Sequence, residues 1–324
     1  MYELALQAAS SKRTLSTVEE GAAGVRLYKH GTISRVGRRL SYIAVAMAGA
    51  PAAAAESQFF DRLRASLWGM HIGDALAMPA HWYYGGAHQI RRDYGSEITG
   101  YIAPTERLPG SIMSLSDTGG GGRGSDQGTV VGDIILHGKR KYWARGGDYH
   151  YHRGMTAGEN TLEVTISRRA YMDSLVENGM ELRREDVRER YITLMTTPDS
   201  HNDTYAGTCH RLFFANRANG LPLDECPDND QHNVDTIDGL VNLVPVVCAA
   251  AAHSGGDAAV GTAAGVATTL FRRSSALPQY GRLYGTMLLQ LLEGGELRST
   301  VTDAARAAHV DLVRMGRQSD PTTA

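Results

Sequence analysis

Three turns of this chain carry clusters of His, Asp, Glu and Asn directly before stretches with helical apolar spacing. They span residues 149–161, 198–205 and 228–238. Carboxylate and amide oxygens are ligands for Mg²⁺, and imidazole can move a proton near neutral pH. Because the N-terminus of a helix carries partial positive charge, three such starts can also form one cleft for an anionic ligand. The pattern favours a hydrolytic site or a site for a polar ligand.

The turn at residues 149–161 is the one around which we organise the others. It places a carboxylate and an amide, Glu159 and Asn160, beside glycine, and an apolar stripe with helical spacing follows from Leu162. This arrangement predicts a helix whose N-terminus presents both side chains to a cleft. The alternative is that Asn160 or Thr161 only caps the helix.

A further polar site lies around the end of an earlier predicted helix. Asp74 comes just before Pro79, which is expected to stop the helix, and His81 comes just after it. Glycine lowers helix propensity, so Gly69 and Gly73 near Asp74 indicate the close approach of another backbone or of a ligand. Alternatively, Asp74 caps a helix or pairs with an arginine.

The overall composition argues against a nucleic-acid-binding protein. The 324 residues include 33 basic and 35 acidic side chains, for a formal net charge of -2. The cysteines, Cys209, Cys226 and Cys248, show no Cys-x-x-Cys spacing, so neither a disulfide framework nor a structural zinc site is indicated. We therefore expect a reducing compartment, by default the cytoplasm.

Residues 1–56 differ in composition from the rest of the chain. They are rich in Arg and Lys and poor in Asp and Glu, and they end in an Ala-rich run at residues 42–55. This extension is expected to be disordered or to be a targeting signal, including one for an organelle. The Ala-rich run is too short to span a membrane. Residues 57–324 are expected to form one folded domain.

The fold predicted for residues 57–324 is all-α. Apolar residues at helical spacing recur through most of this region, and no stretch alternates with period two as a half-buried strand does. Residues 85–130 form the main exception, since they are rich in glycine and read as a long loop or lid.

Three motifs together resemble the ADP-ribosylglycohydrolase family over residues 57–324. They are Gly73-Asp74-Ala75-Leu76, Gly158-Glu159-Asn160-Thr161 and the HNDTYAGTCHR segment that starts at His201. The likeness is greater to the branch with GDALAMPxHWYY and AGENT motifs. The resemblance implies an orthogonal bundle of helices with two Mg²⁺ ions in a central cleft. It also implies removal of ADP-ribose from protein side chains or from related ADP-ribosyl compounds.

The chain departs from the family pattern in several places. Typical members have Thr-Asp-Asp-Thr at residues 158–161, and they commonly carry Glu at the position of His81. They also end with a Gly-Gly-Asp-x-Asp-Thr turn that supplies further metal ligands. Here residues 233–236 imitate that pattern at an earlier place in the chain, so we expect a C-terminal piece to be missing.

Two functions follow from the resemblance, a metal-assisted ADP-ribosyl hydrolase or a weakened relative that binds ligands or serves a structural role like a crystallin. For a hydrolase, the resemblance and the residue types assign the following roles: catalytic Asp74, His81 and Glu159; substrate-binding His152, His201, Asp203 and His232; Mg²⁺-binding Glu159, Asn160 and Asp235. Each of these histidines can instead be a surface or hydrogen-bonded core residue. The expected partner is an ADP-ribosyl compound or an ADP-ribosylated protein, without nucleic acid or membrane.

Overall fold

The computed structural model describes residues 19–20, 26–27, 50–111, 113, 130–231, 233–253 and 256–308. The α-helices are α3 (Ala50–Ala77), α4 (Gly86–Tyr94), α5 (Leu162–Ile166), α6 (Asp173–Glu177), α7 (Arg184–Thr196), α8 (Thr208–Ala218), α9 (Leu243–His253), α10 (Asp257–Ala267), α11 (Leu277–Leu292) and α12 (Leu297–Ala307). Shorter 3₁₀ or π segments are η1 (Met78–Ala80), η3 (Val130–Ile134), η4 (Arg140–Tyr142), η5 (Ser167–Met172) and η6 (Ile237–Leu240). The predicted all-α fold is confirmed. A two-residue antiparallel pair, β1 (Glu19–Glu20) with β2 (Arg26–Leu27), lies near the N-terminus.

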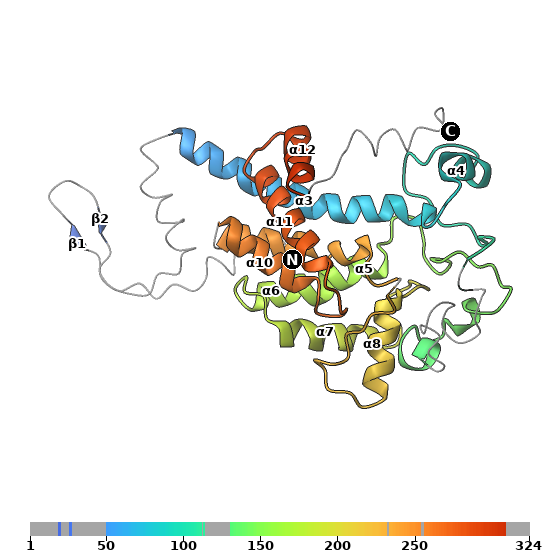
Figure 1. The fold of residues 1–324 in the computed structure, drawn as a ribbon. Coiled ribbons are helices and arrows are strands. Elements are labelled where there is room, and N and C mark those ends of the chain that lie inside the picture. The colour runs from blue at the N-terminus through green and yellow to red at the C-terminus, as the bar shows by residue number, and fades with distance from the viewer. Residues whose placement is uncertain are drawn as a thin grey trace.

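Helix α3 is the long helix that crosses the molecule in Figure 1. It begins at Ala50, ahead of the domain start predicted at residue 57. It ends as predicted near Pro79, which lies in η1, the single 3₁₀ turn that follows α3. This turn brings His81 to the end of α3, seven residues beyond Asp74 along the sequence.

Segments α5, η5 and α6 follow one another without a break and form one helix from Leu162 to Glu177. The apolar stripe predicted for this helix is confirmed, since Leu162, Ile166, Ala170 and Leu175 are all buried. The start of the helix, next to the Gly-Glu-Asn-Thr turn, presents polar groups to segments that are distant in the sequence.

Helices α7 and α8 cross steeply in Figure 1 and enclose an aromatic core. Tyr191 of α7 stacks on Phe271 with ring centroids 3.8 Å apart and meets Phe213 and Phe214 of α8 edge-on or tilted. Every residue of α8 from Thr208 to Ala215 is buried. Polar side chains in the first two turns of α8 are therefore placed inside the protein.

Helices α10 and α11 pack closely because small residues line their contact. A Cβ on Gly281 would lie 2.7 Å from Cγ2 of Thr268, and a Cβ on Gly285 would lie 3.0 Å from Cβ of Ala264. Larger side chains at either glycine would push the helices apart. Small residues in the second half of the chain thus set the spacing of these helices, which closes the bundle behind α5.

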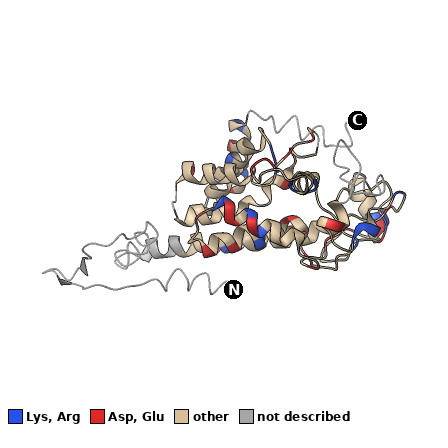
Figure 2. Ribbon diagram, turned by 90° about the horizontal axis from the view of Figure 1, so that it is seen from below, with Lys and Arg blue, Asp and Glu red and all other residues tan. Residues whose placement is uncertain are grey.

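The surface of the described residues carries no one-sided charge. Figure 2 shows segments with Lys or Arg interspersed with segments containing Asp or Glu. This agrees with the net charge of -2 and gives no basic face for a phosphate backbone. In the same residues, no helix has both the length and the apolar character needed to cross a lipid bilayer.

Candidate functional site

The start of α5 binds two carboxylates that come from distant parts of the chain. The backbone N–H of Thr161 donates to Oδ2 of Asp74, and the next N–H, that of Leu162, donates to Oδ2 of Asp203, both at 2.7 Å. The first N–H groups of a helix have no partner inside the helix, and carboxylates favour its positive end. The helix start therefore brings Asp74 and Asp203 to one place.

Asp74 is held by a network of hydrogen bonds from the Gly-Glu-Asn-Thr turn. Its carboxylate accepts from Nδ2 of Asn160 at 2.9 Å and from the hydroxyl of Thr161 at 2.7 Å. Asn160 also donates to the carbonyl oxygen of His71, and its Oδ1 lies 2.9 Å from Nδ1 of His71. Burial raises the pKa of Asp74 above its ordinary value, although the hydrogen bonds from Thr161 and Asn160 oppose this effect.

Asp203, His152 and His81 form a continuous hydrogen-bonded chain. Oδ1 of Asp203 lies 2.7 Å from Nδ1 of His152, and Nε2 of His152 lies 2.5 Å from Nδ1 of His81. The imidazole rings of His81 and His152 are nearly parallel, with an angle of 22° between their planes and centroids 4.7 Å apart. Asp203 and His152 are almost completely buried, while His81 is partly exposed at the outer end.

The charge of Asp203 fixes the protons along this chain. Burial alone would raise its pKa, but His152 and the N–H groups of Tyr205 and Leu162 lower it to about 2. An ionised Asp203 requires His152 to carry its proton on Nδ1, so Nε2 of His152 accepts from Nδ1 of His81. Burial, followed by the neighbouring imidazole of His152, lowers the pKa of His81 to about 3. His81 is therefore neutral at pH 7, with its lone pair on Nε2.

Glu159 lies in the turn at residues 149–161, beside the hydrogen-bonded series from Asp203 to His81, and fixes the conformation of that turn. One carboxylate oxygen accepts from the N–H of Thr156, and the other accepts from Nδ2 of Asn202, both at 2.6 Å. The second bond ties the turn at residues 149–161 to the turn at residues 198–205. The structure thus brings Asp74, Glu159 and their neighbours together with Asp203.

The other histidines of these turns have separate environments. His150 is buried, its Nδ1 accepts from the N–H of His152, and its Nε2 lies 3.1 Å from the carbonyl oxygen of Pro79. His201 lies at the edge, and burial followed by the charge of Lys139 lowers its pKa to about 4. Its Nδ1 is buried and has no partner among the described residues.

The third turn, at residues 228–238, directs Asp238 toward the site, whereas the sequence analysis expected Asp235 there. Asp235 is exposed and accepts from Nδ2 of Asn229 at 3.2 Å. His232 lies outside the described residues. Asp238 instead points inward, since its Oδ2 lies 3.6 Å from the position of a Cβ on Gly207, just before α8.

Sequence reasoning did not single out one polar group below the start of α5. Glu163, Cys209 and His210 lie together there, with Oε1 of Glu163 2.7 Å from Nε2 of His210. The sequence offers only a weak signal for them, a Cys-His pair directly before the apolar run Leu212-Phe213-Phe214.

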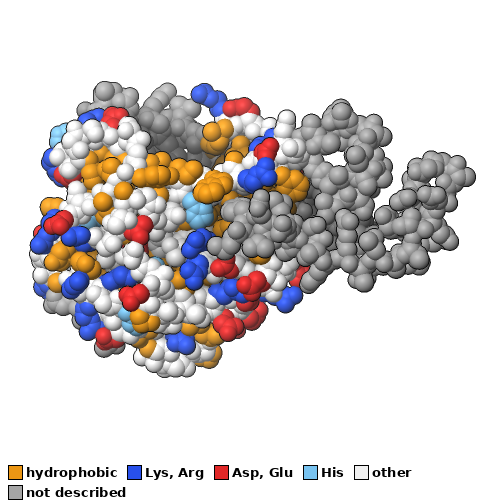
Figure 3. Space-filling view, turned by 180° about the vertical axis from the view of Figure 1, so that it is seen from behind, with side chains coloured by type: hydrophobic (Ala, Val, Ile, Leu, Met, Phe, Trp, Pro, Cys, Tyr) orange, Lys and Arg blue, Asp and Glu red, His pale blue; other side chains and the backbone are white. Residues whose placement is uncertain are grey.

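A pocket of about 500 Å³ opens beside Asp74, between α3, α5, α9 and α11. Its lining is mostly apolar, and Asp74 is the charged residue in it. The glycines of α3 line this pocket, and no described atom lies within 4 Å of a Cβ placed on Gly69 or Gly73. The close approach of another backbone, one of the two sequence-based alternatives, is therefore not found among the described residues. Figure 3 shows that hydrophobic side chains also form a band on the rear face of the molecule.

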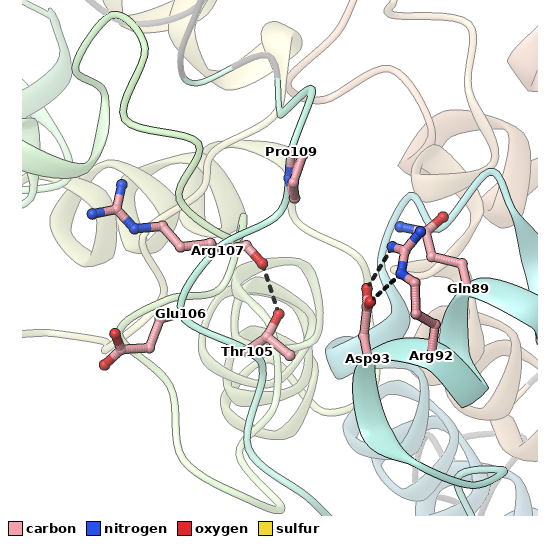
Figure 4. A pocket seen from close by; sticks show the side chains of 7 residues that line it. All are labelled: Gln89, Arg92, Asp93, Thr105, Glu106, Arg107 and Pro109. Carbon is pink, nitrogen blue, oxygen red and sulfur yellow. Dashed lines mark hydrogen bonds and ion pairs between the residues drawn. The ribbon is translucent and has the colours of Figure 1, made fainter.

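A second hollow lies between α4 and residues 105–109 (Figure 4). Its charged groups are already paired, since Arg92 binds Asp93 within the hollow and Glu106 accepts from Arg153 at 2.7 Å. Arg107 points away from Arg92 in Figure 4 and lies over the ring of Tyr149. The charged side chains of this hollow are therefore engaged in contacts within the protein.

Comparison with known proteins gives the family of this chain. A model of the ADP-ribosylglycohydrolase family matches residues 55–322, most of the chain. The chain belongs to the ADP-ribosylglycohydrolase family. No curated protein and no solved structure matched it. As a family member it is related to hydrolases that act on ADP-ribosyl compounds, and the motifs that resembled the family are those that meet at α5.

The residues expected to hold Mg²⁺ do not fit that ion in this arrangement. Both carboxylate oxygens of Glu159 accept hydrogen bonds within the loop, and Oδ1 of Asn160 lies against His71. Asp235 faces solvent beside Asn229. Mg²⁺ requires several oxygen ligands in near-octahedral order, so no catalytic step below is routed through this ion.

Proposed function

We propose that this ADP-ribosylglycohydrolase family member hydrolyses the glycosidic bond of an ADP-ribosyl compound or an ADP-ribosylated protein. The observation that carries the proposal is the chain from Asp203 through His152 to His81, which is anchored on the same helix start as Asp74. A buried carboxylate that orients an imidazole is a recurring arrangement in general-base catalysis. Here a second imidazole extends that arrangement to the surface.

The proposed role of His81 is to take a proton from the attacking water. Water would give its proton to Nε2 of His81 as its oxygen attacks the anomeric carbon of the ribose. The glycosidic bond would break with its electron pair going to the leaving group, which then takes a proton from solvent. The proton on Nδ1 of His81 would pass to Nε2 of His152 across the 2.5 Å hydrogen bond. The resulting imidazolium of His152 lies beside ionised Asp203. The hydrogen-bonded series from His81 to Asp203 thus places the positive charge away from the reacting carbon.

Asp74 and Glu159 are proposed to position the substrate. The transition state of glycosidic hydrolysis resembles an oxocarbenium ion, so nearby carboxylates stabilise its positive charge. Asp74 borders the pocket between α3 and α11, which has room for part of a nucleotide. Glu159 holds the loop that carries His152 against residues 198–205. By default, we expect this activity in a reducing compartment such as the cytoplasm.

One observation favours the second candidate, a weakened relative with a binding or structural role. The carboxylate oxygens of Asp74 and Glu159 are all hydrogen-bonded to neighbouring groups of the protein. Both carboxylates can therefore act as helix or loop caps without any substrate.

The test is release of ADP-ribose from a modified protein, measured with and without Mg²⁺. We expect release by the parent chain and a loss of about 10²- to 10⁴-fold in His81→Gln, since general-base groups contribute that much. His88→Gln is the matched control, because His88 is exposed on α4. Equal rates for His81→Gln and the parent would reject the proposed base. No release under either metal condition would favour the weakened relative.

A further inference from the structure

A group of donor atoms below the start of α5 has the composition of a transition-metal site. The carboxylate of Glu163, the thiol of Cys209 and the imidazole of His210 lie with their ligand atoms within 4.8 Å of one another. Tetrahedral zinc separates its ligand atoms by roughly 3.5 Å. Small side-chain rotations are therefore enough to close these three donors around one ion.

Glu163 is short of hydrogen-bond partners for a carboxylate in this position. Its Oε1 contacts His210, whereas its Oε2 is buried and has no partner among the described residues. Leaving a buried carboxylate oxygen unpaired costs free energy. A metal ion between Glu163, Cys209 and His210 would supply the missing partner.

Asp238 lies beside the group. A Cβ on Gly207 would lie 3.6 Å from Oδ2 of Asp238, 3.8 Å from Oε1 of Glu163 and 3.8 Å from Cδ2 of His210, so the three side chains surround the same glycine. Oδ1 of Asp238 is bound by Arg272 and Thr236. Its Oδ2 is left to act as a fourth ligand, directly or through water.

The surroundings hold the donors as a metal site requires. The hydroxyl of Tyr191 lies 2.7 Å from Nδ1 of His210, which fixes the ring with Nε2 towards Glu163. Such contacts from the outer shell orient the ligands of most protein metal sites. Carboxylates at Glu163 and Asp238 and a Cys209 thiolate carry three negative charges and Arg272 one positive charge. A divalent ion makes this sum zero.

We propose that Glu163, Cys209 and His210 bind a zinc ion, with Asp238 or a water molecule as the fourth ligand. Sulfur, nitrogen and carboxylate donors are the ligand types that Zn²⁺ takes, whereas Mg²⁺ prefers oxygen alone. Because the ligands come from two helices and a turn, no Cys-x-x-Cys spacing is needed. The ion would join α5, α8 and the 236–240 turn behind the proposed catalytic chain, and its role is structural.

The test uses the full chain freed of metal and then supplied with Zn²⁺ or Co²⁺. We expect one equivalent of Zn²⁺ to bind, and Co²⁺ to give a sulfur-to-cobalt charge-transfer band with tetrahedral visible bands. Cys209→Ser should lose the sulfur band and bind Zn²⁺ at least about 10-fold more weakly. Cys248→Ser is the control, since Cys248 is equally buried but lies beside Ser66.

Glu163→Gln gives a second variant, which keeps the size of the side chain and removes its charge. It should also bind Zn²⁺ more weakly, and its circular dichroism spectrum shows whether the fold is kept. Lack of stoichiometric Zn²⁺ binding by the parent chain would overturn the proposal. So would a Co²⁺ spectrum without a sulfur band, or unchanged Zn²⁺ affinity in Cys209→Ser. None of these readouts depends on hydrolase activity.

Discussion

Nδ1 of His152 lies 2.7 Å from Oδ1 of Asp203, and the two side chains are only 3% and 2% exposed. This buried pair links the turn at residues 149–161 to the turn at residues 198–205. It also determines which nitrogen of each following imidazole carries a proton. The predictions below begin with this contact because both the fold and the proposed chemistry depend on it.

Asp203→Asn should reverse the direction of the proton chain. The amide N–H₂ of Asn would donate to Nδ1 of His152, so His152 would carry its own proton on Nε2 and donate to His81. The outer nitrogen of His81 would then hold a proton and could not accept one. We expect hydrolysis to fall by at least about 10²-fold and stability to fall by about 3 kcal/mol, as for a broken buried pair.

Kinetics and urea unfolding measure the two effects of Asp203→Asn separately. Asp235→Asn serves as the matched control, because Asp235 is exposed and its substitution should change stability by less than about 0.5 kcal/mol. Full activity in Asp203→Asn would refute the proposed arrangement of protons.

Glu159→Gln should abolish hydrolysis if the loop must be held by charge-assisted hydrogen bonds. The amide of Gln provides only one acceptor oxygen, so the bond from either Thr156 or Asn202 would be lost. We expect no measurable ADP-ribose release, in an assay run alongside Glu97→Gln, which changes an exposed carboxylate. If Glu159→Gln hydrolyses as fast as the parent, this residue has no part in the site.

Acid should destabilise the protein through His150 at pH values well above those that protonate carboxylates. Burial, followed by the charge of His152, lowers the pKa of His150 to about 4, compared with 6.5 in the unfolded chain. As pH falls below 6.5, His150 binds a proton in the unfolded state but remains neutral in the folded state. Stability therefore decreases from pH 6.5 to pH 4, by about 3 kcal/mol for this residue, and levels off below.

Urea unfolding as a function of pH checks this expectation. His150→Gln removes one titrating group and should reduce the loss of stability between pH 6.5 and pH 4 by about 3 kcal/mol, although the variant is less stable at pH 7. His81 and His201, whose pKa values are also lowered, keep their share of the loss. His88→Gln should leave the shape of the curve unchanged. An equally steep loss of stability in His150→Gln would assign the acid sensitivity to other groups.

Two glycine substitutions should have opposite effects on stability. A Cβ on Gly154 would lie 2.7 Å from the carbonyl oxygen of Asn202, so Gly154→Ala must displace the backbone beside Asp203. We expect a loss of about 2 kcal/mol, typical of overpacking. Gly69→Ala places its methyl group in open space within α3 and should gain up to about 1 kcal/mol. Thermal unfolding of both variants, at equal concentration, measures the difference; the same sign for both would contradict the packing described.

The helical fold and part of the site could be predicted from the sequence for a clear physical reason. Helix periodicity is local, so the stripe from Leu162 to Leu175 is visible without any tertiary information. The sequence could suggest that Asp74 and Asn160 lie close together because both residues stand at helix ends. It could not show that Asp238 rather than Asp235 points inward, since this depends on the fold of the 228–238 turn.

Two features could not be predicted from the sequence: the hydrogen-bonded series from Asp203 to His81 and the group at Glu163. Each residue of the hydrogen-bonded series was named as a candidate, but the order of the contacts results from the packing of three segments that are distant in sequence. Glu163 follows the apolar Leu162 and reads as an ordinary helical position. Cys209 and His210 read as part of an amphipathic helix, whereas α8 is buried on every side in its first two turns.

Successive amides at Thr161 and Leu162 hold Asp74 and Asp203, so the backbone of one residue, Thr161, separates the two anchoring N–H groups. The helical backbone leaves little freedom in that separation. Sliding of the end of α3 past the segment around residue 203 would break at least one of these hydrogen bonds. Any opening that admits a large ligand must occur elsewhere along the rim, by movement of loops that do not carry these anchors.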